Sequence, residues 1–222
     1  RELGGRIMEK TPSNVLRLPY VHAIFPQSKL IYIIRDPLAQ VSSSEFRWRN
    51  AINPRHARRR LFETPKTQLH HYLGRALWDH FRKKILRKKH VSVWGVRYPG
   101  IYDDLKTIPR EHIMAKQWAA CSKQMAEDIA RLPEGLVYQV RYEDIMAEPV
   151  TQFKNMCAHV GIEPPASALE KVAQTVDPSR QNKWKRMDPA LIESILPFVR
   201  DEMDRHGYEV PTDLQDEAQR AR

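Results

Sequence analysis

Long apolar runs and cysteines are both scarce in this sequence. No apolar run approaches the roughly 18 residues of a membrane span, and the N-terminus lacks the charged-then-apolar layout of a signal peptide. Its two cysteines, Cys121 and Cys157, lie far apart, with no CxxC spacing and no accompanying histidine pattern. A disulfide framework and a zinc site are therefore not indicated. These absences favour a cytoplasmic location, whereas an anchor ahead of Arg1 would imply a secretory compartment.

The chain also lacks a GxxxxGK[ST] loop, the Walker motif that cradles nucleotide phosphates. What it has in excess is positive charge, with 37 Lys and Arg residues against 27 Asp and Glu and a formal net charge of +10. Such a balance indicates an anionic ligand, a nucleic acid or an acidic surface as partner, and it does not bear on the fold. With 222 residues and 41% hydrophobic content, the chain can form one α/β domain spanning residues 1–222.

The hydrophobic pattern predicts buried strands at residues 6–8, 30–34 and 136–140, separated by helical stretches. The continuous run Leu30-Ile31-Tyr32-Ile33-Ile34 is typical of a parallel strand that is buried on both faces. Helical spacing predicts helices over 13–25, with a kink or boundary at Pro19, and over 38–49, 111–131, 150–160, 166–176 and 189–206. This order of elements favours a three-layer α/β domain with a parallel sheet.

Residues 51–100 form a basic stretch inside this predicted domain. The run Arg82-Lys83-Lys84-Ile85-Leu86-Arg87-Lys88-Lys89 is its centre, and apolar residues recur every three or four positions from Leu69 to Ile85. We therefore expect a large helical insertion with an amphipathic helix whose basic face points outward. That face is either an ordinary solvated surface or a surface for an acidic substrate or a polyanion. Residues 94–100 are expected to form a structural turn.

Three predicted strands are each followed by polar side chains. Lys10-Thr11-Pro12 follows the first strand, and Arg35-Asp36-Pro37 follows the second, with Ser43 and Arg47 on the next helix. Arg141-Tyr142-Glu143-Asp144 follows the third. Ligands of open α/β sheets bind outside the carboxyl ends of the strands, so these side chains predict an anion site there. Glu143 and Asp144 are expected to cap or pair at the strand end.

Together these motifs resemble the sulfotransferase superfamily, in particular its tyrosylprotein and bacterial branches. In that family, an arginine at a strand end and a serine eight residues later bind the 3'-phosphate of 3'-phosphoadenosine 5'-phosphosulfate, and Arg35 and Ser43 have this spacing. The resemblance implies that Arg47 adds a second phosphate-binding arginine, that Tyr142 contacts adenine, and that Lys183 contacts the nucleotide. A forked, permanently charged donor suits a dianionic phosphate, and helix hydroxyls and backbone N–H groups can complete the cradle. For Lys183, the alternative is an exposed lysine beside a core tryptophan.

By the same resemblance, Lys10 is the catalytic residue, near the bridging or sulfuryl oxygens of the donor. Pro12 stands where the cytosolic enzymes have a histidine base, which favours branches whose base is a glutamate on a helix upstream. Glu9 is a formal alternative, although strand alternation would point it away from Lys10. The family's phosphosulfate loop is not found in the chain, so we expect a longer protein in which that loop precedes Arg1. If nothing precedes Arg1, weak nucleotide binding and no catalysis are expected.

The resemblance implies a P-loop-like domain that moves a sulfuryl group from 3'-phosphoadenosine 5'-phosphosulfate to a hydroxyl, or less readily an amine, by in-line displacement. No metal is required by this chemistry. The acceptor is open among carbohydrates, tyrosyl peptides and small molecules, and nucleic acid is not the expected partner. The alternatives are a nucleotide kinase-like phosphotransferase, which the absent phosphate loop disfavours, and a non-catalytic module that binds polyanions or nucleic acid through the basic stretch.

Overall fold

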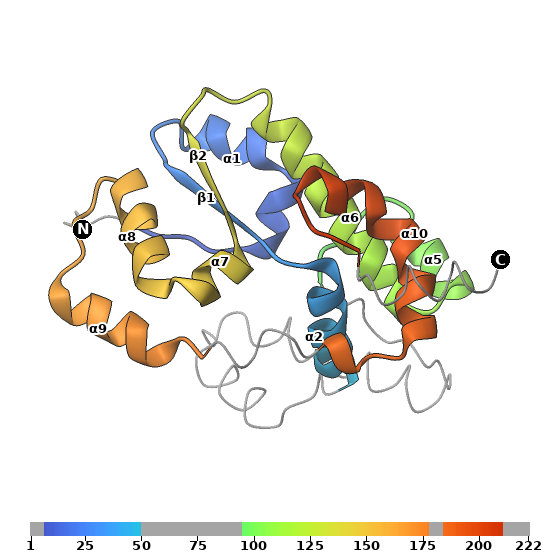
Figure 1. Ribbon diagram of the computed structural model, residues 1–222. Helices are drawn as coiled ribbons and strands as arrows, with labels where there is room; N and C mark the ends of the chain where they lie inside the picture. The colour runs from blue at the N-terminus through green and yellow to red at the C-terminus, as the bar shows by residue number, and fades with distance from the viewer. Residues whose placement is uncertain (1–6, 50–94, 178–183, 211–222) are drawn as a thin grey trace, which may run out of the picture.

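The computed structural model describes residues 7–49, 95–177 and 184–210, without the side chains of 45–49. Figure 1 shows helices on both sides of a pair of strands. The elements of the first half of the chain are η1 (Pro12–Leu16, a 3-10 helix), α1 (Leu18–Ile24), β1 (Leu30–Ile34), α2 (Pro37–Arg49), α5 (Ile101–Thr107) and α6 (Arg110–Ile129). The second half has β2 (Val137–Arg141), α7 (Tyr142–Ala147), α8 (Pro149–His159), α9 (Ala166–Thr175) and α10 (Pro189–Arg205).

The two strands pair in parallel, with Leu30 opposite Val137 and Ile34 opposite Arg141. Within the described ranges they form a two-stranded sheet. Because parallel strands end at the same edge, Arg35 and Tyr142, which follow them directly, come to the same end of the sheet. The predictions of an α/β fold with a parallel sheet and of a strand at 30–34 are confirmed, and the strand predicted at 136–140 is found one residue later, at Val137–Arg141.

Helices pack on both faces of this sheet, and the faces are recognised by alternate side chains. Tyr32 and Ile34 of β1 are buried in the main core, together with residues of α6 and α10. On the opposite face, the Tyr138 hydroxyl donates a hydrogen bond to the Gln152 side chain of α8 at 3.1 Å. The sheet therefore lies between a layer containing α6 and α10 and a layer containing α8.

One expectation for β1 is wrong, since the strand is not buried on both faces. Ile31 and Ile33 are 39% and 50% exposed, whereas Tyr32 and Ile34 are buried. The second helical layer contacts β2 through α7 and α8, and it leaves these two isoleucines exposed. A continuous β-branched run reports a strong preference for strand, but it does not say which neighbours cover each face.

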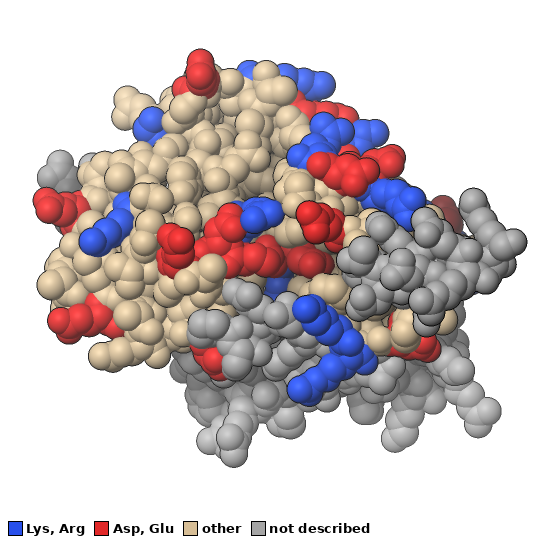
Figure 2. Space-filling model, in the orientation of Figure 1, with Lys and Arg blue, Asp and Glu red and all other residues tan. Residues whose placement is uncertain are grey.

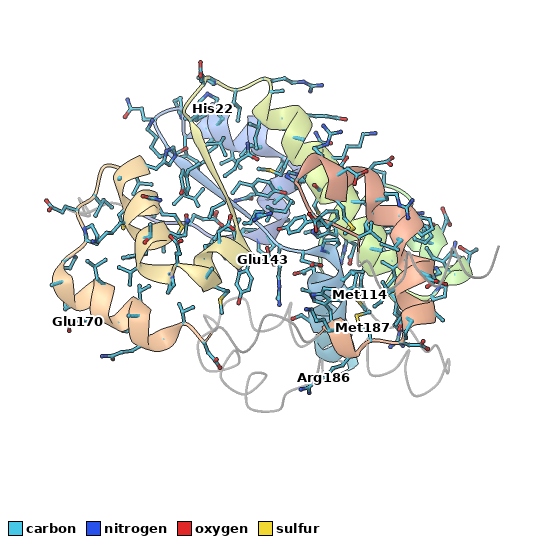
Figure 3. All side chains as sticks on the ribbon, in the orientation of Figure 1. His22, Met114, Glu143, Glu170, Arg186 and Met187 are labelled. Atoms are coloured by element: carbon cyan, nitrogen blue, oxygen red, sulfur yellow. The ribbon has the colours of Figure 1, made fainter. Side chains whose placement is uncertain are left out.

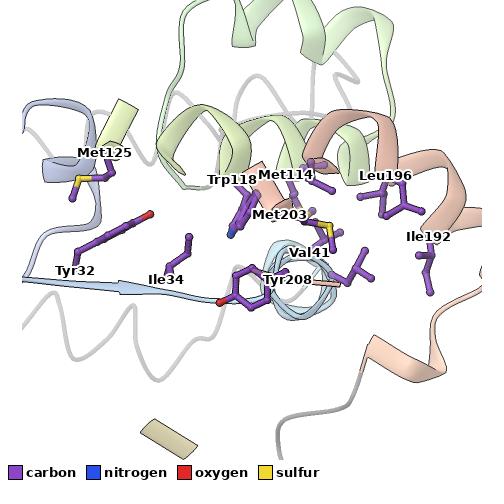
Figure 4. Close-up of a cluster of buried hydrophobic side chains, with 14 of the residues drawn as sticks. Tyr32, Ile34, Val41, Met114, Trp118, Met125, Ile192, Leu196, Met203 and Tyr208 are labelled. Carbon is purple, nitrogen blue, oxygen red and sulfur yellow. The ribbon is translucent and has the colours of Figure 1, made fainter. Parts of the chain in front are cut away.

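The main core joins elements that are distant in the sequence. Figure 4 shows Tyr32 and Ile34 of β1 lined up with side chains of α2, α6 and α10. Trp118 of α6 packs edge-on against Tyr208, which follows α10, with ring centroids 6.5 Å apart. This packing brings the end of α10 close to the carboxyl end of β1.

Most of the predicted helices are confirmed to within a few residues, and α5 and α7 were missed. The predicted helix over 13–25 divides at Arg17 into η1 and α1, with Pro19 in the first turn of α1. The strand predicted at 6–8 is wrong, because Ile7 and Met8 form no strand and are 81% and 93% exposed. Residues 51–94 of the predicted insertion lie outside the described residues. Residues 95–100 form a turn-rich connection, as expected, and Gly100 at φ 87° precedes α5.

Candidate anion site at the ends of the strands

The turn from β1 into α2 is fixed by an aspartate cap. The Asp36 Oδ1 atom accepts hydrogen bonds from the backbone N–H groups of Leu38 at 2.7 Å and Ala39 at 3.1 Å. Pro37 is the first helical residue, a position where its missing N–H costs nothing. The N–H groups of Leu38 and Ala39 are therefore already bound within the protein. For these two groups, the expectation that backbone N–H groups of the helix complete an anion cradle is wrong.

The backbone of Arg35 is fixed by a hydrogen bond to its carbonyl oxygen. Its guanidinium, in contrast, has one N–H donor for which no described residue provides an acceptor. Its carbonyl oxygen accepts a hydrogen bond from the Trp118 indole Nε1–H at 2.8 Å. The guanidinium carbon lies 4.7 Å from the centroid of the Tyr142 ring, a cation–π contact between the ends of the two strands. The Arg35 Nε atom is buried and has no hydrogen-bond partner among the described residues. A buried, unpaired donor on a permanent cation is costly, so this arrangement suits an anionic ligand.

Glu143, the residue after Tyr142 and labelled in Figure 3, forms hydrogen bonds to two distant parts of the chain. Its Oε1 accepts a hydrogen bond from the Asp36 backbone N–H at 3.2 Å. Its Oε2 accepts one from the Tyr208 hydroxyl at 2.9 Å. The Tyr142 ring thus contacts Arg35, and the Glu143 carboxylate contacts the next residue, Asp36.

Arg141, at the end of β2, is already neutralised within the protein. Its guanidinium donates to both carboxylate oxygens of Asp144, at 3.1 and 3.3 Å, and to the Gly207 carbonyl oxygen at 3.3 Å. The bonds to Asp144 raise the pKa of Arg141 further. The expectation that Glu143 and Asp144 cap or pair at the strand end is confirmed. Of the two strand-end arginines, only Arg35 keeps the buried unpaired donor described above.

The carboxyl groups of this cluster are crowded. Burial raises the pKa of Asp36 above its ordinary value, the Glu143 carboxylate raises it too, and the hydrogen bonds from Ala39 and Leu38 oppose them. Burial, followed by the charge of Glu143, raises the pKa of Tyr208, so its hydroxyl stays protonated and remains a donor.

The remaining predicted phosphate ligands lie along α2. Ser43 is half-buried, and Arg47 occupies the same face of the helix four residues later. Ser43 lies roughly 9 Å along the helix axis from Pro37, at 1.5 Å per residue. The Arg47 side chain and the whole of Lys183 lie outside the described residues. Trp184, next to Lys183, packs against the main core.

Lys10 is exposed, in the stretch that leads into η1, and η1 packs against α6, the helix that carries Trp118. Glu9 accepts a hydrogen bond from the Asn14 Nδ2–H at 2.7 Å and another from the Thr11 hydroxyl. Because these residues form no strand, the alternation argument for Glu9 does not apply, and Glu9 is instead tied to the start of η1. The roles predicted for Lys10, Arg35, Ser43, Arg47, Tyr142 and Lys183 stay predictions.

Two residues of this cluster were missed by sequence reasoning, namely Trp118 and Tyr208. Trp118 lies within α6 and Tyr208 just after α10, and large aromatic residues in such places are most often simply core. They differ from the other core residues because the Trp118 indole N–H and the Tyr208 hydroxyl form hydrogen bonds to the residues at the strand ends, and no local pattern in the sequence reveals such bonds.

Among the described residues, no three His, Cys, Asp or Glu side chains come together to hold a metal ion. None of the described helices is long and apolar enough to span a membrane.

Comparison with known families supplies the identification. The sequence model of the Sulfotransferase family matches residues 2–107 and 102–166, which is well over half of the chain. The chain belongs to the sulfotransferase family. The expected resemblance is therefore confirmed, and it places the chain in a family of transferases.

A solved structure supports the same fold. The chain is similar to the "Sulfotransferase Domain from the Curacin Biosynthetic Pathway", with a TM-score of 0.55 and 16% sequence identity over 91% of this chain. The match spans 62% of that domain's length. At this identity the likeness concerns the fold alone. A comparison with curated protein sequences finds no significant match.

Proposed function

We propose that the protein is a sulfotransferase that uses 3'-phosphoadenosine 5'-phosphosulfate as donor and a hydroxyl group, or less readily an amine, as acceptor. An acceptor oxygen attacks sulfur, the bond from sulfur to the bridging oxygen breaks in line, and adenosine 3',5'-bisphosphate leaves. The acceptor proton passes to a general base. Membership of the family and the fold support this proposal, and we extend it to a P-loop-like arrangement of the sheet.

The observation that carries the proposal is the environment of the Arg35 side chain. Its backbone is held by Trp118 and its guanidinium rests on Tyr142, yet its buried Nε–H has no acceptor among the described residues. A guanidinium fixed in this way is preorganised for a phosphate, because the ordering cost has already been met in folding. We assign the 3'-phosphate of the donor to Arg35, with Ser43 and Arg47 as further ligands.

The roles of the other residues follow from the resemblance of their motifs to those of the sulfotransferase family. The Arg35 guanidinium covers one face of the Tyr142 ring, so the adenine would meet the rest of that side chain. Lys183 would contact the nucleotide. Lys10 would offset the negative charge that accumulates on the bridging oxygen in the transition state. The acceptor, for which we keep carbohydrates, tyrosyl peptides and small molecules, would enter from the side of the sulfuryl group.

The direct test is calorimetric titration of the full-length protein with adenosine 3',5'-bisphosphate and, separately, with AMP. We expect the bisphosphate to bind about 10- to 100-fold more tightly, because only it places a phosphate against Arg35. Arg35→Ala should abolish this preference while leaving AMP binding almost unchanged. Arg97→Ala is the matched control, because Arg97 also lies over a tyrosine ring, that of Tyr102 at 5.9 Å, but is exposed ahead of α5.

Equal binding of the two nucleotides by the unchanged protein would reject the proposed donor site. A preference that survives in Arg35→Ala would keep the function but would place the 3'-phosphate elsewhere.

A further inference from the structure

Tyr208 lies outside every motif that the proposed function uses, yet it is bonded to the centre of the site. It follows α10, is almost fully buried, and donates its hydroxyl hydrogen to Glu143 Oε2 at 2.9 Å. The inference drawn from this contact rests on the proposed function. We propose that Tyr208 is a positioning residue for the anion site, acting through Glu143 on the turn that carries Arg35.

A chain of hydrogen bonds leads from Tyr208 to the backbone of Arg35. Glu143 receives the Tyr208 hydroxyl on one oxygen and the Asp36 N–H on the other, so the carboxylate is held at both ends. The Asp36 N–H belongs to the peptide whose carbonyl is that of Arg35. That carbonyl oxygen accepts the Trp118 indole N–H, so both sides of this peptide unit are fixed by side chains. Trp118 itself packs edge-on against Tyr208.

Tyr208 also orients the negatively charged carboxylate of Glu143. Tyr142 lies against the Arg35 guanidinium, so the neighbouring Glu143 carboxylate is in the same cluster as a cationic donor that no described residue accepts. Carboxylate and guanidinium form strong bidentate pairs when geometry allows. The Tyr208 hydroxyl and the Asp36 N–H are two of the groups that orient the Glu143 carboxylate. Loss of the hydroxyl removes one of these bonds, and the carboxylate can then turn toward Arg35 and compete with the phosphate for it.

The decisive variant is Tyr208→Phe, which removes one oxygen atom and keeps the ring in the core. In the full-length protein we expect binding of adenosine 3',5'-bisphosphate to weaken about 10-fold, with AMP changed less than about 2-fold. Tyr102→Phe, which deletes an exposed tyrosine hydroxyl on α5, is the control and should change neither affinity.

A second variant separates positioning from simple loss of packing. Glu143→Gln keeps an acceptor for the Asp36 N–H but removes the charge that competes for Arg35. We therefore expect the double variant Tyr208→Phe/Glu143→Gln to regain bisphosphate affinity to within about 3-fold of the unchanged protein. If the double variant is as weak as Tyr208→Phe, or weaker, the inference is overturned, because removal of the Glu143 charge would not rescue a purely structural defect.

A readout without nucleotide keeps this inference separate from the proposed function. The Arg35 Nε–H resonance can be followed by NMR and assigned through its loss in Arg35→Lys. We expect it to shift in Tyr208→Phe and to return in the double variant. If the unchanged protein shows no preference for the bisphosphate, the proposed function fails, and this resonance alone decides the inference. An Arg35 resonance that is identical in the unchanged protein and in Tyr208→Phe would refute it.

Discussion

Arg141 is the last residue of β2, opposite Ile34, and Arg35 directly follows β1, so both arginines lie at the carboxyl ends of the parallel strands and each is near an aspartate. Asp144 lies one helical turn beyond Arg141 on α7, so its carboxylate turns back to the guanidinium. Asp36 directly follows Arg35, and its carboxylate instead caps α2. Arg141 is therefore neutralised by Asp144. Arg35, which also has an aspartate nearby, keeps a buried N–H donor that has no acceptor among the described residues. At the scale of single residues, the direction in which one carboxylate points decides which arginine keeps an unpaired donor.

Lys10 is the residue whose role is best tested by kinetics. If it acts only on the charge of the transition state, Lys10→Ala should lower kcat for sulfuryl transfer about 100-fold and change the affinity for adenosine 3',5'-bisphosphate less than about 3-fold. Lys29→Ala is the control, because Lys29 is also exposed but precedes β1, at the opposite end of the strand. Equal losses in both variants, or a loss confined to binding, would argue against this role.

The helix α2 links the candidate anion site to the stability of the fold. Its N-terminus is capped by Asp36, and its apolar face, including Leu38 and Val41, is buried in the core. A capping side chain contributes about 1 kcal/mol, and asparagine caps as well as aspartate. The cap is thus needed for the helix, whereas its charge is not.

Substitution of Asp36 should separate these two properties. We expect Asp36→Ala to lower the free energy of unfolding by about 1 kcal/mol and Asp36→Asn to change it by less than about 0.5 kcal/mol near neutral pH. Since burial raises the pKa of Asp36, the folded state binds this proton more tightly than the unfolded state does. The stability that this group contributes is then present at acid pH and is lost as the pH rises through the raised pKa.

Denaturant unfolding at neutral and mildly acidic pH measures this linkage. The unchanged protein should gain stability relative to Asp36→Asn as the pH falls. If it instead loses stability relative to that variant on acidification, the carboxylate form is the one favoured by the fold, and the interpretation of the Asp36 environment is wrong.

Over the whole molecule, the excess charge is confined to one segment. Residues 50–94 contain twelve Lys and Arg and two Asp and Glu, which accounts for the entire formal net charge of +10. The rest of the chain is balanced, and on the face drawn in Figure 2 a row of acidic side chains crosses the described surface. The basic balance of the chain therefore does not describe the environment of Arg35. We keep a surface for acidic substrates on the basic segment as a proposal of its own.

Salt dependence distinguishes a nucleotide site from a polyanion surface. A ligand that makes two charge contacts should lose about 10-fold in affinity for a fourfold rise in salt, whereas a polyanion that contacts six to ten basic residues loses about 10³- to 10⁵-fold. We expect the smaller loss for adenosine 3',5'-bisphosphate, measured by calorimetry. A steep loss together with indifference to the 3'-phosphate would favour the polyanion-binding alternative.

The sequence by itself determined the helices of the second half, the two parallel strands and the positions of Arg35 and Tyr142 at their ends. These follow from periodicity and from the order of residues along the chain, which are local properties. The strand predicted at 6–8 failed, because two apolar residues in a row say little without neighbours to pair with, and both Ile7 and Met8 are exposed.

Only the tertiary structure decided which faces of β1 are covered and which groups surround Arg35. Trp118 and Tyr208 are 83 and 173 positions away from Arg35 along the chain, and they reach its turn because α6 and α10 pack against the same side of β1. A hydrogen bond between such distant residues leaves no periodic signal in the sequence. It exists because the core brings the helices together, and the candidate anion site depends on that packing.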